Sequence, residues 1–418
     1  VLLVGFRIPA KWAMPVLVGV QGGVGGALFE AQMALAGIEM REFLRLVTAR
    51  VVVLHAMAGT LMPTFMVMMT TRFFGEKKSW TEGLSIFPFA LLGGLAFTVP
   101  YTLTGIFLGP EFPSLLGAPV GLVIVTFAAK RKFLVPVDSW DFPPPQKWPA
   151  EWVSGLEVKG KDEVARKPLS TVTAWAPYLM LAVLLVISRL PQLPVGSWLR
   201  IVRVAWDDIF ATGISAVTTP LYLPGFILVL VVAITFFLHR MTGPALRRAV
   251  SESSRVLLGA GFVLIFTVPM VRVYINSDVN GAGFFSMPIA MAEWVASNVG
   301  QVWPMFAGVT GALGAFIAGS NTVSNLMFSA FQYGVAERLA ISGVLIVALQ
   351  AVGAAAGNMI AIHNVVAASA TVGLLGKEGA TLRKTILPTI YYLFVIGVLG
   401  LLAVHVLKVV DPLMGIGN

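Results

Sequence analysis

The sequence contains no cysteine among its 418 residues. Disulfide bridges, thiolate-bound metals and cysteine nucleophiles are therefore excluded from its chemistry.

Charge is also scarce, since Asp, Glu, Lys and Arg make up only 12% of the residues, whereas soluble domains carry about 25%. Hydrophobic residues reach 57%, and the mean hydropathy is +0.86. So few charges cannot cover the surface of a soluble fold, and a disordered chain is far less hydrophobic. We therefore predict an all-α polytopic membrane protein, with about 10–11 transmembrane or broken, re-entrant helices at roughly 20 residues per crossing.

Long apolar runs predict the individual membrane spans. They lie at residues 12–30, 46–70, 84–108, 115–129, 175–190, 221–239 and 256–275. The chain begins at Val1 inside an apolar run, without the charged start of a leader, so we expect further helices to precede it.

The net charge of +9 follows the predicted topology. Three alternate loops, at 71–83, 130–172 and 239–255, hold fifteen Lys and Arg residues, whereas the loops between them hold four. This is the positive-inside pattern, in which basic loops face the cytoplasm and the anionic headgroups of the lipid bilayer. Nucleic acid is therefore not expected as a partner.

One long polar insert divides the chain. Residues 130–172 contain three consecutive prolines and mixed charges, and they show no apolar face. We predict an N-terminal membrane bundle at 1–129, a cytoplasmic linker at 130–172 and a C-terminal bundle with broken helices at 173–418. The outside connection 191–220 is either an interfacial amphipathic segment or an ordinary structured loop.

Two stretches in the last third, residues 294–336 and 339–376, contain no charged side chain. Small and polar residues interrupt them at Gly319–Asn325 (GSNTVSN) and Gly357–Asn364 (GNMIAIHN). Non-helical backbone at membrane depth is tolerated only where it is buried or lines a wet cavity, so these breaks indicate a transporter site. A Gly-rich break at 21–26 lies in the other half, and together they favour an inverted-repeat secondary carrier.

The polar side chains of the two late breaks are the candidate substrate-binding residues, because hydroxyls, amides and a helix N-terminus can hold an anion. They are Ser320, Asn321, Thr322, Ser324, Asn325, Asn358 and Asn364. The alternative for each is helix packing, in which small and polar residues form hydrogen bonds between helices.

Two titratable residues are candidates for proton coupling. His363 is the only titratable side chain in its charge-free stretch and can change charge near neutral pH. Glu30 follows the Gly-rich break. The alternatives are a neutral histidine bonded across helices and an outside-facing acid. We interpret His55 as a hydrogen-bonded histidine of the bundle and Asp278 as part of a solvated turn with Asn280.

The sequence resembles the L-lactate permease family at Gly319–Gln332 (GSNTVSNLMFSAFQ), Gly357–Glu378 (GNMIAIHNVVAASATVGLLGKE) and Asp278–Gly281. The resemblance implies a bacterial or archaeal inner-membrane carrier that takes up L-lactate and similar 2-hydroxy acids with a proton. The Ser320–Thr322 triplet is also similar to a Ser-Asn-Thr motif of divalent-anion sodium symporters, where it holds the carboxylate and the cation.

The chain departs from the family pattern at two positions. The best-known members have an acid at the position of Asn321 and a lysine at that of Asn358. The paired change predicts that the two positions face each other, with an amide pair in place of an ion pair. It also leaves open a family branch with other substrates.

We therefore expect a carrier, not an enzyme, for proton-coupled uptake of a small monocarboxylate such as L-lactate or glycolate across the plasma membrane. No metal or cofactor is expected beyond the coupling ion, and ATP drive is not supported because no GxxxxGK[ST] loop is present. One alternative is a sodium-coupled carboxylate or dicarboxylate carrier. The other is a membrane-embedded redox subunit, although the four histidines show no haem-pairing pattern. The oligomeric state stays open.

Overall fold

The computed structural model describes residues 27–413, except 111, 138–139, 149–169, 191, 210–215, 252, 255–265, 267–268, 271–272, 275, 372–376 and 411. Within these residues the chain forms two compact units. Unit 1 combines residues 1–158 with 266–418, and unit 2 comprises residues 159–265. Each unit is described by itself.

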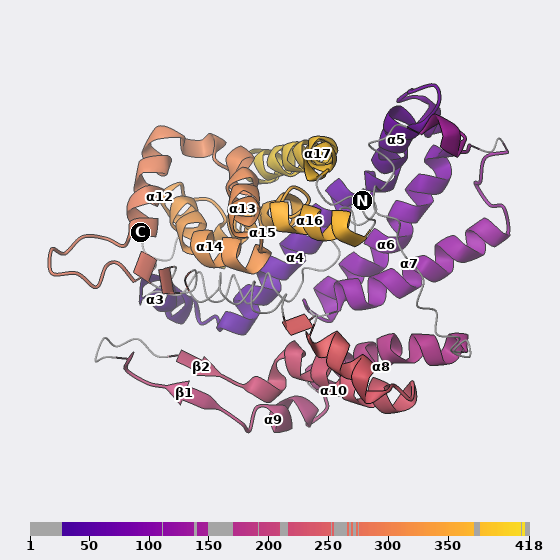
Figure 1. Cartoon of the computed structure of the whole chain (residues 1–418). Coiled ribbons are helices and arrows are strands. Elements are labelled where there is room, and N and C mark those ends of the chain that lie inside the picture. The colour runs from indigo at the N-terminus through magenta and orange to yellow at the C-terminus, as the bar shows by residue number, and fades with distance from the viewer. Residues whose placement is uncertain are drawn as a thin grey trace. The chain divides into compact units, whose positions relative to one another are not determined.

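Unit 1 is helical wherever its elements are described (Figure 1). Short 3-10 turns occur at Glu82–Ile86, Pro145–Lys147 and Gly300–Val302. Its α-helices are α3 (Ala27–Ala36), α4 (Met40–Gly59), α5 (Met62–Phe74), α6 (Phe87–Phe107), α7 (Pro113–Lys130), α12 (Met287–Asn298), α13 (Pro304–Ala318), α14 (Asn321–Arg338), α15 (Gly343–Gly357), α16 (Ile362–Thr371) and α17 (Glu378–His405).

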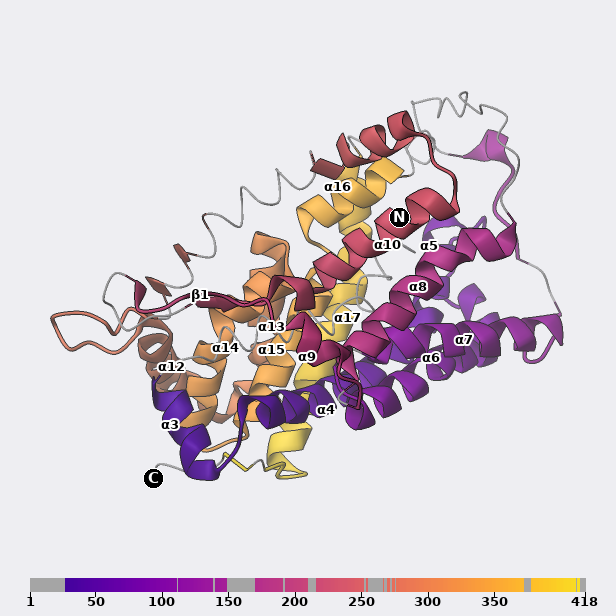
Figure 2. The same cartoon turned by 90° about the horizontal axis from the view of Figure 1, so that it is seen from below.

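Unit 2 contains a helical pair and a short β-ribbon. Helix α8 (Thr171–Arg189) packs on α10 (Pro224–Leu238), and α9 (Val195–Leu199) lies between them in the sequence (Figure 2). Strands β1 (Val204–Trp206) and β2 (Ala216–Thr218) pair antiparallel, with Val204 opposite Thr218. The described part of connection 191–220 thus contains a short helix and a β-ribbon, and both sequence alternatives for it stay predictions.

Five helical segments of the described chain are long and apolar enough to cross a membrane. Three shorter apolar helices accompany them, at Gly225–Leu238, Pro304–Ala318 and Gly343–Gly357. The five segments are Met40–Phe74, Glu82–Phe107, Pro113–Lys130, Val172–Arg189 and Glu378–His405. These positions confirm the all-α polytopic prediction and four of the predicted spans. Much of spans 12–30 and 256–275 lies outside the described residues.

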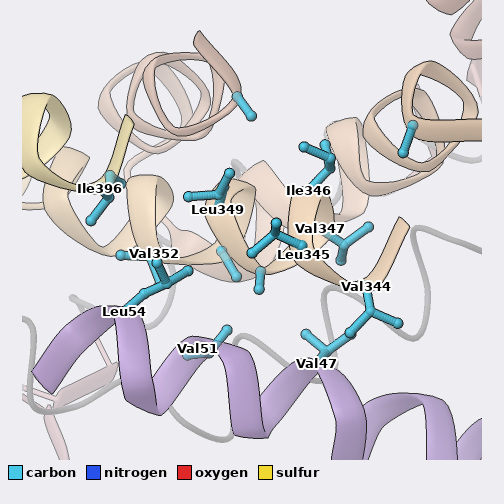
Figure 3. Close-up of a cluster of buried hydrophobic side chains, with 14 of the residues drawn as sticks. Val47, Val51, Leu54, Val344, Leu345, Ile346, Val347, Leu349, Val352 and Ile396 are labelled. Carbon is cyan, nitrogen blue, oxygen red and sulfur yellow. The ribbon is translucent and has the colours of Figure 1, made fainter. Parts of the chain in front are cut away.

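Helix α15 is the centre of unit 1, because all fifteen of its residues are buried. A helix that is apolar around its whole circumference must be covered on every side, and α4, α13, α14 and α17 cover this one. Helix α4 contributes an apolar stripe at i, i+4 and i+7, namely Val47, Val51 and Leu54, which faces α15 (Figure 3). Helices from both predicted bundles thus meet in one unit, and the division at 130–172 stays a prediction.

Glycine allows α13 and α15 to approach closely. A Cβ atom on Gly353 would lie 1.9 Å from the carbonyl oxygen of Gly308, and one on Gly311 would lie 2.2 Å from that of Gln350. Gly357 repeats the contact against Ala312 at 2.3 Å. Small residues four apart are the usual means by which membrane helices bring their backbones together, and here they bring the ends of both helices to one region.

Candidate functional site

The first predicted break is a two-residue turn between α13 and α14. Gly319 adopts a left-handed conformation with φ of 65°, and Ser320 is extended. The Ser320 hydroxyl accepts a hydrogen bond from the backbone N–H of Val323, at 3.4 Å, and so caps α14. Helix α14 therefore begins at Asn321, and the positive end of its dipole lies there.

The second predicted break separates α15 from α16. Helix α15 ends at Gly357, Asn358 follows as its C-cap, and α16 begins at Ile362. Both sequence-predicted interruptions are therefore real breaks between helices.

Three asparagines tie the two breaks together. The Asn358 side-chain amide donates to Oδ1 of Asn321. Asn364 Nδ2 in turn lies 3.2 Å from Oδ1 and 3.3 Å from the carbonyl oxygen of Asn358. Asn321 and Asn358 are buried, and Asn364 is half-buried. The prediction that positions 321 and 358 face each other is confirmed, and neutral amides join the start of α14 to the end of α15.

Ser324 belongs to a different group of contacts, which holds α13, α14 and α15 together. Its hydroxyl donates to the carbonyl oxygen of Gly311 at 2.8 Å and accepts from Gln350 Nε2 at 3.1 Å. Gln350 Oε1 accepts from Gln332 Nε2 at 3.0 Å, and Gln332 Oε1 accepts from the Trp303 indole at 2.8 Å. For Ser324 this favours the helix-packing alternative.

Sequence reasoning did not single out Trp303, Gln332 or Gln350. Both glutamines lie in the charge-free stretches. That location was the one sequence signal that they form buried hydrogen bonds. Uncharged polar side chains in such stretches are costly to bury unless they are paired.

Asn325 contrasts with these satisfied groups. Its side chain is fully buried, yet neither Oδ1 nor Nδ2 has a hydrogen-bond partner in the described part of the chain. Ser329, one turn further along α14, is also fully buried and its hydroxyl is likewise unpartnered there. Each such group costs about 1–3 kcal/mol. Ser329 was missed in the sequence, because serine in a small-residue helix is ordinary packing.

The remaining binding candidates, Ser320 and Thr322, are half-buried at the start of α14. They flank Asn321 and so lie at the same helix end as the asparagine cluster. Within the described residues no three His, Asp or Glu side chains gather into a set that could hold a metal ion.

The proton-coupling candidates are placed only by their backbones. His363 lies in the first turn of α16, next to Asn364, and Glu30 lies in α3, but the side chains of both are outside the described residues. Phe29 packs on Tyr333 of α14 with ring centroids 4.9 Å apart. Tyr333 lies twelve residues beyond Asn321, about 18 Å along the helix, so α3 contacts α14 far from the asparagine cluster. The Gly-rich break 21–26 lies outside the described residues.

The two sequence interpretations of structural residues are confirmed. His55 is buried, and its Nδ1 shares a hydrogen bond with the Tyr392 hydroxyl, which joins α4 to α17. Asn280 forms a solvent-exposed turn with Asp278, in which its Oδ1 accepts from the N–H groups of Ala282 and Phe284.

The family model for L-lactate permease matches residues 14–407. A Haemophilus influenzae protein provisionally named an L-lactate permease is 26% identical, over 93% of this chain and 74% of its own length. The glycolate permease of Escherichia coli is 25% identical over 84% of this chain and 64% of its own.

The L-lactate permease of Bacillus subtilis is 24% identical, over 85% of this chain and 66% of its own length. The chain thus spans between 64% and 74% of the length of these three relatives. No solved structure matches it.

Proposed function

This chain belongs to the L-lactate permease family, and from that premise we propose that it is a secondary carrier of L-lactate, glycolate or a similar 2-hydroxy monocarboxylate. It is a multi-pass membrane protein, which in bacteria places it in the inner membrane. The relatives' names support a small organic acid as substrate and a transporter rather than an enzyme.

One observation carries the proposal: the start of α14 and the end of α15 meet at a cluster of neutral amides inside a charge-free part of the membrane domain. The N-terminus of a helix is a ready site for an anion, because its first N–H groups and its dipole both favour negative charge. In transporters such broken helices form the substrate site.

The carboxylate is assigned to the start of α14, where Ser320, Asn321 and Thr322 supply hydroxyl and amide donors. Asn358 and Asn364 complete the cluster from α15 and α16. Substitution of Asn321 by alanine is expected to weaken substrate binding. An unchanged affinity would remove Asn321 from the site.

Proton coupling is the second part of the proposal, with His363 as the first candidate and Glu30 as the second. His363 adjoins Asn364, and its α16 backbone lies beside the cluster, whereas Glu30 lies in α3. No cofactor is proposed. Sodium coupling is the alternative, supported by the Ser-Asn-Thr triplet at 320–322.

The test is uptake of labelled L-lactate by the full natural protein in liposomes. We expect accumulation against a gradient when the outside is made acidic, and loss of accumulation when a protonophore is added. A requirement for sodium without any response to pH would replace the proton by sodium. Failure to transport L-lactate or glycolate under either gradient would overturn the proposal.

His363→Ala separates coupling from binding. Because the imidazole is proposed to carry the proton, the variant should lose proton-driven accumulation and keep exchange of internal for external substrate. His405→Ala is the matched control, since His405 is an exposed residue at the end of α17. A His363 variant with normal accumulation would leave the residue a structural role.

A further inference from the structure

Helix α14 contains two buried polar side chains that have no hydrogen-bond partner in the described part of the chain. Asn325 and Ser329 are both 0% exposed, and no partner for their side chains exists among the described residues. Native proteins rarely keep such groups without a partner, and each one calls for an explanation.

The other buried polar groups of α14 show that the bundle can supply partners. Ser324 has two hydrogen-bonding neighbours, and Gln332 bonds to Gln350, to Trp303 and to the carbonyl oxygen of Ala307. Asn321 is paired with Asn358. Among the described side chains of α14, Asn325 and Ser329 are the buried polar ones without a hydrogen-bond partner. This points to a partner that is not part of the described chain.

The two unpartnered side chains lie on α14 just beyond the proposed carboxylate site. Asn321, Asn325 and Ser329 stand at i, i+4 and i+8, so their side chains follow one face of the helix. Neighbours on such a face have Cβ atoms about 5–6 Å apart. A molecule of two or three carbons can therefore contact the first turn of α14 and Asn325 at once.

The hydrogen-bonding capacity of the pair fits a hydroxyl. A carboxylate only accepts hydrogen bonds and would leave Asn325 Oδ1 unmatched, whereas an alcohol both donates and accepts. Glycolate and L-lactate are the acids after which these relatives are named. Both acids have a hydroxyl on the carbon beside the carboxylate.

We propose that Asn325 and Ser329 bind the 2-hydroxyl group of the substrate and so determine selectivity for 2-hydroxy acids. Asn325 Oδ1 accepts from the hydroxyl, and Asn325 Nδ2 or the Ser329 hydroxyl donates to its oxygen. This inference rests on the proposed function, and it adds Ser329 to the site.

The test compares L-lactate with propionate, which has the same carbon skeleton and carboxylate but lacks the hydroxyl. Each acid is measured as a competitor of labelled L-lactate uptake, with the full natural protein in liposomes. Wild type should prefer L-lactate, because a site built to bond a hydroxyl rejects the analogue that lacks it. Ser329→Ala and Asn325→Ala should each lower that preference about tenfold, through weaker L-lactate binding with propionate unchanged.

Ser324→Ala is the matched control. Ser324 is also a fully buried serine of α14, but its hydroxyl is bonded to Gly311 and Gln350. Its removal should lower thermal stability without changing the ratio between the two acids. Ser329→Ala removes no protein hydrogen bond in the described structure and should fold normally.

A second measurement does not depend on alanine variants. The 418 residues contain no cysteine, so Ser329→Cys introduces a thiol that is unique within them, with little change in shape. L-Lactate should slow alkylation of this thiol during turnover, and propionate should slow it less.

The outcomes separate the two proposals. Unchanged selectivity in the Asn325 and Ser329 variants, or a thiol at 329 that L-lactate does not protect, would show that the pair holds only water and would overturn the inference alone. A wild-type protein that transports no carboxylate would overturn the proposed function and the inference together.

Discussion

The contact between Asn321 and Asn358 is the residue-scale feature on which the site depends. Each amide is buried, and each supplies the partner of the other. Replacing one asparagine by alanine therefore leaves a buried amide group of the other without its hydrogen-bond partner. Replacing both removes that unpartnered group as well.

A double-mutant cycle tests this pairing. Asn321→Ala and Asn358→Ala should each destabilise the protein, and the double variant should lose about 1–2 kcal/mol less than the sum of the two. The measurement is the free energy of unfolding in detergent. Asn321→Ala combined with Tyr392→Phe in α17 is the control pair and should be additive. Additivity within the asparagine pair would contradict the contact.

Tyr392 offers a second test at this scale, because its hydroxyl bonds to His55 across α4 and α17. Tyr392→Phe keeps the ring and removes the bond, so we expect a loss of about 1 kcal/mol in stability. The pH dependence of transport should not change, because His55 is assigned a structural role. A shifted pH profile would instead make His55 a coupling residue.

Individual site residues were only partly predictable. The reciprocal change at 321 and 358 was sufficient to predict a contact, because loss of one charge favours loss of the opposite charge. Ser324 and Ser329 could not be told apart in the sequence. Both are serines in one charge-free helix, and only the neighbouring helices decide which hydroxyl finds a partner.

At the scale of the element, the helix breaks were the most predictable feature. Gly319 can adopt a positive φ at little cost and Ser320 can cap a helix, so GSN marks the end of one helix and the start of the next. The β1–β2 ribbon was not predicted. Its strands are three residues each, too short for an alternating pattern to stand out.

The α13–α15 contact gives an element-scale prediction. A methyl group on Gly353 cannot be accommodated against the Gly308 backbone, so Gly353→Ala should force the helices apart and cost about 1–3 kcal/mol. Thermal unfolding in detergent measures the loss. Gly379→Ala in α17 is the control, because nothing lies within 4 Å of its Cβ position. Equal stability of the two variants would contradict the close packing.

At the scale of the whole molecule, the apolar runs predicted four of the five long membrane-spanning segments and missed Glu378–His405. Hydropathy could not predict which helices meet. Val47, Val51 and Leu54 read as an ordinary apolar stripe, and nothing in their spacing identifies α15 as the partner. Contacts between residues about 300 positions apart in the sequence depend on shape complementarity, which periodicity does not report.

The asymmetric distribution of Lys and Arg predicts the orientation in the membrane. Lys147→Cys lies in the linker expected inside, and Arg203→Cys in the connection expected outside; both positions are exposed. A membrane-impermeant maleimide should label position 203 in intact cells and position 147 only after permeabilisation. Labelling of position 147 in intact cells would reverse the topology.

The neutrality of the asparagine cluster also bears on how the protein would respond to membrane voltage. Moving one elementary charge through 100 mV takes about 2.3 kcal/mol. The described side chains at the start of α14 and the end of α15 are amides and hydroxyls, so they contribute no charge to the return of the empty carrier. At this site any electrical work of the cycle would then be performed by the substrate and its coupling ion.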